Sequence, residues 1–174
     1  MRHTKIYTAE GDITKIPADA LITAINSGGM WYGGIDGAIQ RVAGDLYHKQ
    51  AKAAMPLRNL QTVVARGGAR PDRKIGFRDV VFVVDDLESP LNEVIYTGLE
   101  AASEYKSVTI PTIRLGVMQG IIEKTPQEAI ARMADGVNDF LDKYAEITKL
   151  ENIKFVVYNN PILAETMSSV LNKI

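Results

Sequence analysis

The sequence predicts an α/β fold of three layers, in which helices cover both faces of a mostly parallel, mixed sheet. Short apolar runs bounded by turn residues alternate with helical patterns from one end of the chain to the other. Such alternation favours a parallel sheet, because each crossover between parallel strands places a helix on a face of the sheet. No internal repeat, linker or low-complexity tract is visible, so we expect residues 1–174 to form one domain.

Six apolar runs are predicted to be strands. They cover residues 6–9, 20–25, 60–65, 80–84, 107–111 and 155–158. The run at 80–84, Val-Val-Phe-Val-Val, has the strongest pattern of a buried strand. Residues 66–74 are polar, basic and rich in glycine and proline, which predicts a loop.

Five helices are expected between these strands, over residues 36–43, 45–54, 90–105, 126–144 and 161–173. Asp36 is a candidate N-cap of the first helix. Thr125, Pro126 and Glu128 have the spacing of a capping box at the start of the fourth. Pro161 suits the first position of the last helix.

Composition excludes several classes of site. The chain has no cysteine, which rules out disulfides, thiolate nucleophiles and cysteine-based zinc sites. The only histidines, His3 and His48, are far apart and are expected to be surface or packing residues, so no metal or cofactor is predicted. The net charge of -1 gives no overall attraction to nucleic acid or to anionic membranes. Without a long apolar run, we expect a cytoplasmic protein that does not contact the membrane.

The segment 23–39 carries the most informative pattern. A buried strand runs into a loop containing four glycines, and the loop ends where a helix is predicted to start. Glycines let the backbone approach a ligand closely, and a helix N-terminus offers free N–H groups to an anion. The segment matches neither of the two standard phosphate-binding glycine motifs. From these residues alone, a phosphate cradle and a tight turn without a ligand remain equal alternatives.

Two separated motifs give this pattern a family resemblance. Gly-Asp-Ile-Thr stands at residues 11–14, and Thr-Ala-Ile-Asn at 23–26 is followed by Gly-Gly-Ile-Asp-Gly-Ala-Ile at 33–39. In order and spacing these motifs resemble the macrodomain family, and the order of elements suits that family over nearly the whole chain. The resemblance implies a macrodomain-like fold that binds ADP-ribose or a derivative of it.

The resemblance also implies roles for individual residues. Asp12 would accept a hydrogen bond from the adenine amino group, with the Ile13 backbone beside it. Asn26 and Asp36 would lie near the distal ribose and are the predicted catalytic residues, with Asp36 helping to activate water. Each has a structural alternative: Asp12 and Asn26 as turn residues, and Asp36 as a helix cap. Thr23 departs from the asparagine that the family usually has there.

The loop after residue 111 is the second ligand-binding segment that the resemblance implies. Gly116 and Val117 keep its backbone pattern, whereas Arg114 and Met118 replace residues typical of the family. Arg114 would pair with a phosphate or remain a solvated loop charge. The predicted ligand-binding residues are Asp12, Ile13, Gly33, Gly34, Ile35, Arg114, Gly116, Val117, Met118 and Tyr158.

Aromatic residues appear at both ends of this predicted site. Trp31 and Tyr32 stand where relatives commonly have glycine, so the distal-ribose side is rebuilt. Tyr158 would stack on the adenine or, alternatively, belong to the core.

Three functions therefore remain open. The chain would bind ADP-ribose, or it would also hydrolyse ADP-ribosyl linkages or process a phosphorylated ADP-ribose without a metal. The third function is that of a catalytically inactive macrodomain that binds another nucleotide-type ligand or single-stranded RNA. For the first two functions, the expected partner is ADP-ribose or an ADP-ribosylated macromolecule. The basic residues that would favour RNA are Arg66, Arg70, Arg73, Lys74 and Arg78, and a solvated loop is the favoured explanation for them. We expect a monomer.

Overall fold

The computed structural model describes residues 3–28, 34–68, 74–116 and 119–174. The described strands form a sheet in the order β1 (Lys5–Glu10), β6 (Asn152–Val157), β5 (Ser107–Ile110), β2 (Ala18–Ile25), β4 (Phe77–Val84) and β3 (Thr62–Ala65). Every neighbouring pair is parallel except β3 and β4, which are antiparallel. The predicted mixed, mostly parallel sheet is confirmed, with its antiparallel strand at one edge.

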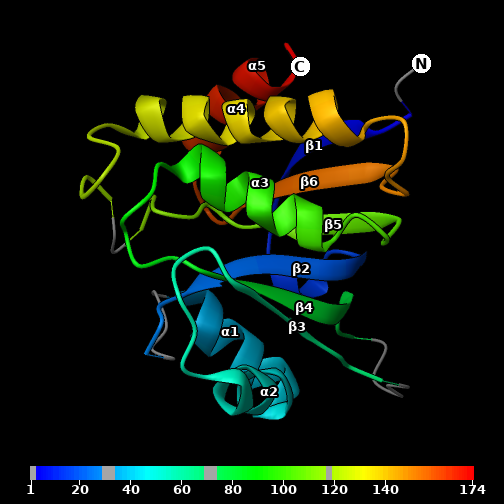
Figure 1. Ribbon diagram of the computed structural model, residues 1–174. Helices are drawn as coiled ribbons and strands as arrows, with labels where there is room; N and C mark the ends of the chain where they lie inside the picture. The colour runs from blue at the N-terminus through cyan, green and yellow to red at the C-terminus, as the bar shows by residue number, and fades with distance from the viewer. Residues whose placement is uncertain (1–2, 29–33, 69–73, 117–118) are drawn as a thin grey trace.

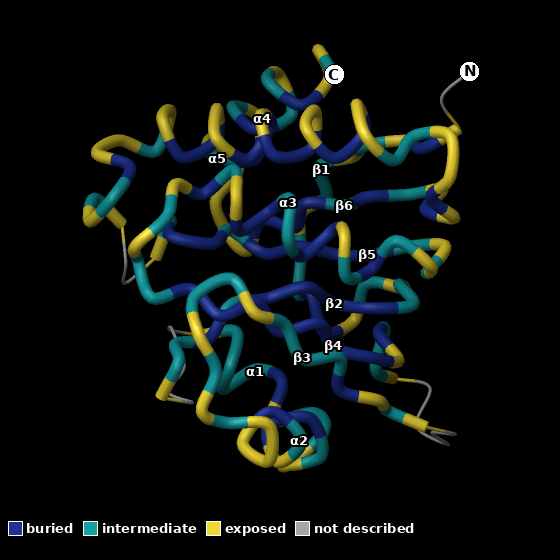
Figure 2. The backbone as a smooth tube through the Cα atoms, viewed as in Figure 1, coloured by how far each residue is buried: buried dark blue, intermediate teal, exposed yellow. Residues whose placement is uncertain are grey.

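Helices cover both faces of the sheet, as predicted. One face carries α1 (Gly34–Ala43) and α2 (Leu46–Ala54), and the other carries α3 (Leu91–Ala101), α4 (Pro126–Tyr144) and α5 (Pro161–Leu171) (Figure 1). Figure 2 shows the strands and the inner sides of the helices as the buried part of the molecule. Because neighbouring residues of a strand face opposite ways, Leu21 and Ile22 belong to separate cores on the two faces. Among the described helices, none combines the length and apolar character that a membrane crossing requires.

The predicted cap forms at α4, and α5 begins at Pro161 as predicted. The Thr125 side chain accepts a hydrogen bond of 3.1 Å from the Glu128 N–H. The Glu128 carboxylate reaches back to the Lys124 N–H at 3.0 Å, one residue before the N–H of an ideal capping box. At α5, Asn160 is the cap and accepts from the Leu163 N–H at 3.1 Å. These side chains satisfy N–H groups that a helix start leaves without partners.

Several predicted boundaries are wrong. Strands β4 and β6 begin three residues earlier than predicted, at Phe77 and Asn152. Helix α1 begins at Gly34, so Asp36 lies in its first turn and is not its cap. Strand β3 begins at Thr62, because Leu60 has a φ of 68°, which no strand residue adopts. Helix α3 ends at Ala101 because the next N–H, at Ala102, is shared between the Gly98 and Leu99 carbonyls in a tightened last turn.

The parallel arrangement brings loops far apart in sequence to one edge of the sheet. Strands β1, β6, β5, β2 and β4 all end there, on the left of Figure 1. With a spacing of 4.7–4.9 Å between strands, five strand ends extend over about 19 Å. Ligands of open parallel sheets bind at this edge, and several of the predicted site residues, such as Asp12 and Gly116, follow strands that end there.

Candidate functional site

A cavity of about 420 Å³ follows the carboxyl edge of the sheet. It runs from Asp12, which follows β1, to Asp85, which follows β4. Its lining is Gly11, Asp12, Ile13, Thr23, Ala24, Gly34, Ile35, Ala38, Arg41, Asp85, Pro111, Thr112, Ile113, Arg114, Gly116, Val156 and Tyr158. The cavity therefore suits an elongated ligand that lies across the ends of five strands.

Asp12 forms one end of the cavity. One carboxylate oxygen, Oδ1, accepts from the Thr14 N–H at 3.0 Å and from the Thr14 hydroxyl at 2.7 Å, which makes Asp12 the cap of the short helix η1 (Ile13–Lys15). The hydroxyl hydrogen bond is the main cause that lowers the pKa of the Asp12 carboxyl. The other oxygen, Oδ2, makes no hydrogen bond to a described residue. Asp12 thus has the predicted turn role and keeps an acceptor for a ligand.

The start of α1 lines the middle of the cavity through Gly34 and Ile35. N–H groups in the first turn of a helix have no partner within it and attract anions. A Cβ added at Gly34 would meet no atom within 4 Å, so the backbone is openly accessible there.

Arg41 lies on the same side of α1 as Gly34 and Ala38, since these positions recur at helical spacing. It is exposed, forms no ion pair with a described residue and contributes to lowering the pKa of Asp12. An unpaired guanidinium that lines a cavity is suited to pair with an anionic group of a ligand. The sequence analysis missed Arg41, although its spacing of seven from Gly34 was a usable signal.

Arg114 occupies the opposite end of the cavity wall and belongs to a buried charge cluster. Its Nε and Nη2 donate to the two oxygens of Asp85 at 3.1 and 2.8 Å, and its Nη1 donates to Glu123 at 2.9 Å. A fourth bond of 2.7 Å runs from Nη2 to the Ser89 carbonyl. All three charged side chains are at most 3% exposed. Burial alone would lower the pKa of Arg114, but the bonds to Asp85 and Glu123 raise it above its usual value.

This cluster corrects one expectation for Arg114. A solvated loop charge is excluded, because the side chain is 2% exposed. Pairing of the guanidinium with a ligand phosphate is disfavoured, because its N–H groups already donate to two carboxylates. Arg114 nonetheless lines the cavity, beside Gly116.

Asp36 does not face the described cavity. At 3.6 residues per turn it lies on the side of α1 away from Gly34 and Ala38, and its carboxylate contacts the His48 side chain of α2. Burial raises the pKa of Asp36, and burial lowers the pKa of His48, which is 2% exposed. His48 also packs against the Phe82 ring at 5.6 Å, so it is a packing residue as predicted. The catalytic role of Asp36 stays a prediction.

Asn26 also lies outside the cavity lining of the described residues. Its side-chain oxygen accepts from the Gly28 N–H at 3.0 Å, which is the turn role that the sequence left open. The next N–H, at Ser27, donates to the Asp86 carboxylate at 2.7 Å. The loop that starts here is therefore held from the end of β4.

Tyr158 lines the cavity and is 74% exposed, so the alternative of a core tyrosine is wrong. Ile13 opens η1 and is 4% exposed, and its N–H has no partner within that helix. Gly33, Val117 and Met118, with Trp31 and Tyr32, fall outside the described residues.

Asp85 and Asp86 are the main site residues that the sequence analysis missed. They follow the clearest predicted strand, at the edge where ligands bind. Position alone could have marked them, although their partners Arg114 and Ser27 are distant in sequence.

Those basic residues considered for RNA that the structure describes lie at the other edge of the sheet. Arg66 follows β3 and Arg78 belongs to the start of β4, on the right of Figure 1. Arg66 donates to the buried Asp79 at 3.2 Å and to the Tyr105 hydroxyl at 3.0 Å, which offsets part of the positive charge. Arg70 and Arg73 are outside the described residues. In the described part of the chain, no three His, Cys, Asp or Glu side chains gather as metal ligands.

Comparisons with known proteins find relatives in sequence and in fold. No family model matches the chain. The chain is 31% identical to an O-acetyl-ADP-ribose deacetylase of Escherichia fergusonii over 170 residues, covering 90% of the chain and 89% of that protein. It is 30% identical to a protein of the same name from Salmonella typhimurium over 168 residues, covering 90% of the chain and 88% of that protein.

Solved structures extend the likeness to the fold. A Trypanosoma brucei macrodomain in complex with ADP superposes with a TM-score of 0.77 at 21% identity, over 95% of this chain and 68% of that one. The same macrodomain in complex with ADP-ribose gives 0.74 at 21% identity, over 97% and 68%. Together with the sequence relatives, these likenesses show that the chain belongs to the macrodomain family.

Proposed function

We propose that this protein binds ADP-ribose or a close derivative in the cavity at the carboxyl edge of the sheet. The observation that carries the proposal is the order of chemical groups along the cavity. A carboxylate oxygen of Asp12 that bonds to no described residue stands at one end, and the N–H groups at the start of α1 stand in the middle. These groups suit an adenine amino group and a diphosphate, in the order in which ADP-ribose carries them.

Three further predicted ligand-binding residues, Ile13, Tyr158 and Gly116, would contact the ligand in the same pose. Ile13 would contact the adenine beside Asp12, and the exposed Tyr158 would stack on it. Gly116 would approach the diphosphate through its backbone. Gly33, Val117 and Met118 remain proposed ligand contacts from the sequence.

Calorimetry with ADP-ribose tests the proposal. We expect measurable heat for the wild type and much weaker binding for Asp12→Ala, because the adenine loses its acceptor. Asp135→Ala, in an exposed ion pair on α4, is the matched control and should bind as the wild type does. Absence of heat with wild-type protein at millimolar ADP-ribose would exclude this function.

A second candidate function is removal of the acetyl group from O-acetyl-ADP-ribose, the activity in the names of the sequence relatives. Asn26 and Asp36 are its proposed catalytic residues. A deacetylation assay of the wild type separates the two functions, and the same assay of Asp36→Ala tests the role of that residue. Full activity in that variant would remove Asp36 from the mechanism, whereas no activity in the wild type would leave a binding module. The cytoplasm remains the proposed compartment.

A further inference from the structure

The cluster of Arg114, Asp85 and Glu123 ties two loops together at one end of the cavity, the loop between β4 and α3 and the loop between β5 and α4. Asp85 follows β4, the Ser89 carbonyl precedes α3, and Glu123 precedes α4. Arg114 itself belongs to the loop after β5, which lines the cavity from Pro111 to Gly116. The Arg114 guanidinium therefore links two loops that no pairing between β4 and β5 would hold together.

The backbone at Arg114 requires this support. Its φ of 63° lies in the left-handed region, which a residue other than glycine adopts at a cost in free energy. Such a conformation persists when the surroundings determine it, and here four side-chain hydrogen bonds do so. The loop also bonds within itself, from the Leu115 N–H to the Thr112 carbonyl at 3.1 Å.

The charges of the cluster decide what Arg114 contributes to a ligand. Two buried carboxylates more than offset the guanidinium and leave the cluster a formal charge of -1, so the described residues at this end of the cavity offer backbone groups and no free positive charge. A loop that is already held in its bound conformation binds a ligand more tightly than a loop that must first become ordered, because ordering the loop on binding costs free energy.

We propose that Arg114 is a positioning residue: through Asp85 and Glu123 it holds the loop 111–116 ready for the half of the ligand beyond the adenine. The proposal rests on the proposed function, since it names what sets affinity at the same site. It predicts a loop that is ordered before any ligand binds. It also predicts that disturbing the cluster weakens the part of the ligand near this loop and spares the adenine end at Asp12.

Hydrogen exchange of the wild-type protein without ligand gives the first test. We expect the amides of Ile113 and Leu115 to exchange slowly, because both are hydrogen-bonded in the held loop. Exchange at the rate of an unstructured chain would overturn the proposal without any variant.

Arg114→Lys gives the second test, because it keeps the charge but cannot bond both carboxylates in the same planar fork. We expect the Kd for ADP-ribose to rise about tenfold, while the Kd for AMP changes by less than about twofold. Exchange should accelerate over residues 111–116 and not over α5. Asp85→Asn serves as a second variant with the same expectations, since it keeps nearly the same shape and removes one charge of the cluster.

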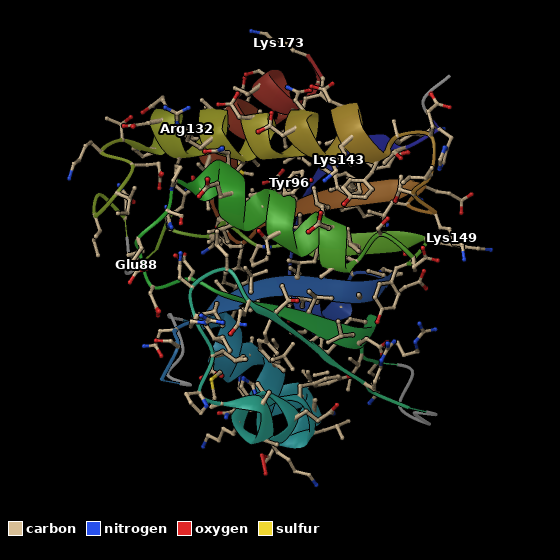
Figure 3. All side chains as sticks on the ribbon, in the orientation of Figure 1. Glu88, Tyr96, Arg132, Lys143, Lys149 and Lys173 are labelled. Atoms are coloured by element: carbon tan, nitrogen blue, oxygen red, sulfur yellow. The ribbon has the colours of Figure 1, made fainter. Side chains whose placement is uncertain are left out.

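The control is Arg132→Lys on α4 (Figure 3). The Arg132 side chain is 46% exposed and pairs with Asp135, and neither residue lines the cavity. This variant should change neither affinity. An unchanged Kd for ADP-ribose in Arg114→Lys, an equal loss for AMP, or faster exchange throughout the chain would each overturn the positioning role. Failure of the wild type to bind ADP-ribose would instead contradict the proposed function.

Discussion

Asp12→Asn separates the two roles of this carboxylate in one substitution. In the wild type, Oδ1 caps η1 through two bonds to Thr14, and Oδ2 is left for the ligand. Asparagine keeps an oxygen for the Thr14 N–H and places an NH₂ group where Oδ2 was. The NH₂ is a donor and would face the amino group of adenine, which is also a donor.

The expected magnitude follows from these contacts. A base contact of this kind discriminates by about 1–3 kcal/mol, so the affinity for ADP should fall by about 5- to 150-fold. Stability should change little, because loss of a whole cap costs only about 1 kcal/mol and asparagine retains most of it. Guanine presents an acceptor where adenine has its amino group, so the variant should lose much less affinity for GDP.

Calorimetry with ADP and GDP, together with thermal unfolding, measures all of these quantities. The wild type should prefer ADP, and Asp12→Asn should reduce or invert that preference at nearly constant Tm. A variant that keeps the wild-type ratio of ADP to GDP affinity would refute the assignment of Asp12 to adenine. A large drop in Tm with equal losses for both nucleotides would instead assign Asp12 to structure alone.

Three further substitutions probe other parts of the structure. Arg41→Gln should weaken ADP-ribose binding severalfold and reduce its salt dependence, because Arg41 lines the cavity and forms no ion pair with a described residue. Calorimetry at two ionic strengths measures both effects, and unchanged binding would show that Arg41 takes no part in it. Burial lowers the pKa of His48 below 6.5, so the unfolded chain takes up a proton first and stability is lost as pH falls below about 6.5. In His48→Gln the fall in Tm from pH 7 to 5 should therefore be smaller, and an identical slope would contradict this reasoning. Gly136→Ala should destabilise by about 1–3 kcal/mol in urea unfolding, because its Cβ would stand 2.8 Å from Cβ of Ile95; an unchanged midpoint would mean that α3 and α4 separate easily.

Local patterns in the sequence predicted much of the fold. The alternation of strands and helices, the Thr125 cap and the Pro161 start are each encoded within a few residues. The motifs also placed Asp12 and Gly34 at the cavity. Such features depend on neighbours in the chain, which is why a single sequence reveals them.

The missed features depend on partners distant in sequence. Arg114 and Asp85 are 29 residues apart, and a charged residue in a polar loop gives no sign that it will be buried. Asp36 was predicted as a cap from its position before an apolar run, but α1 starts two residues earlier and turns the carboxylate toward His48. Only the packing of α1 against α2 determines that contact.

Glu123 joins the cavity to the helical layer behind it. One of its oxygens accepts from Arg114, and the other accepts at 3.1 Å from the N–H of Leu91, the first residue of α3, where Pro90 has no side chain that can cap. The same carboxylate thus completes both the cavity wall and a helix start. Thermodynamic linkage is reciprocal, so a ligand that favours the held loop must also protect the first turn of α3 against fraying. Ligand binding in this cavity would consequently stabilise the first turn of α3, a helix that does not line the cavity.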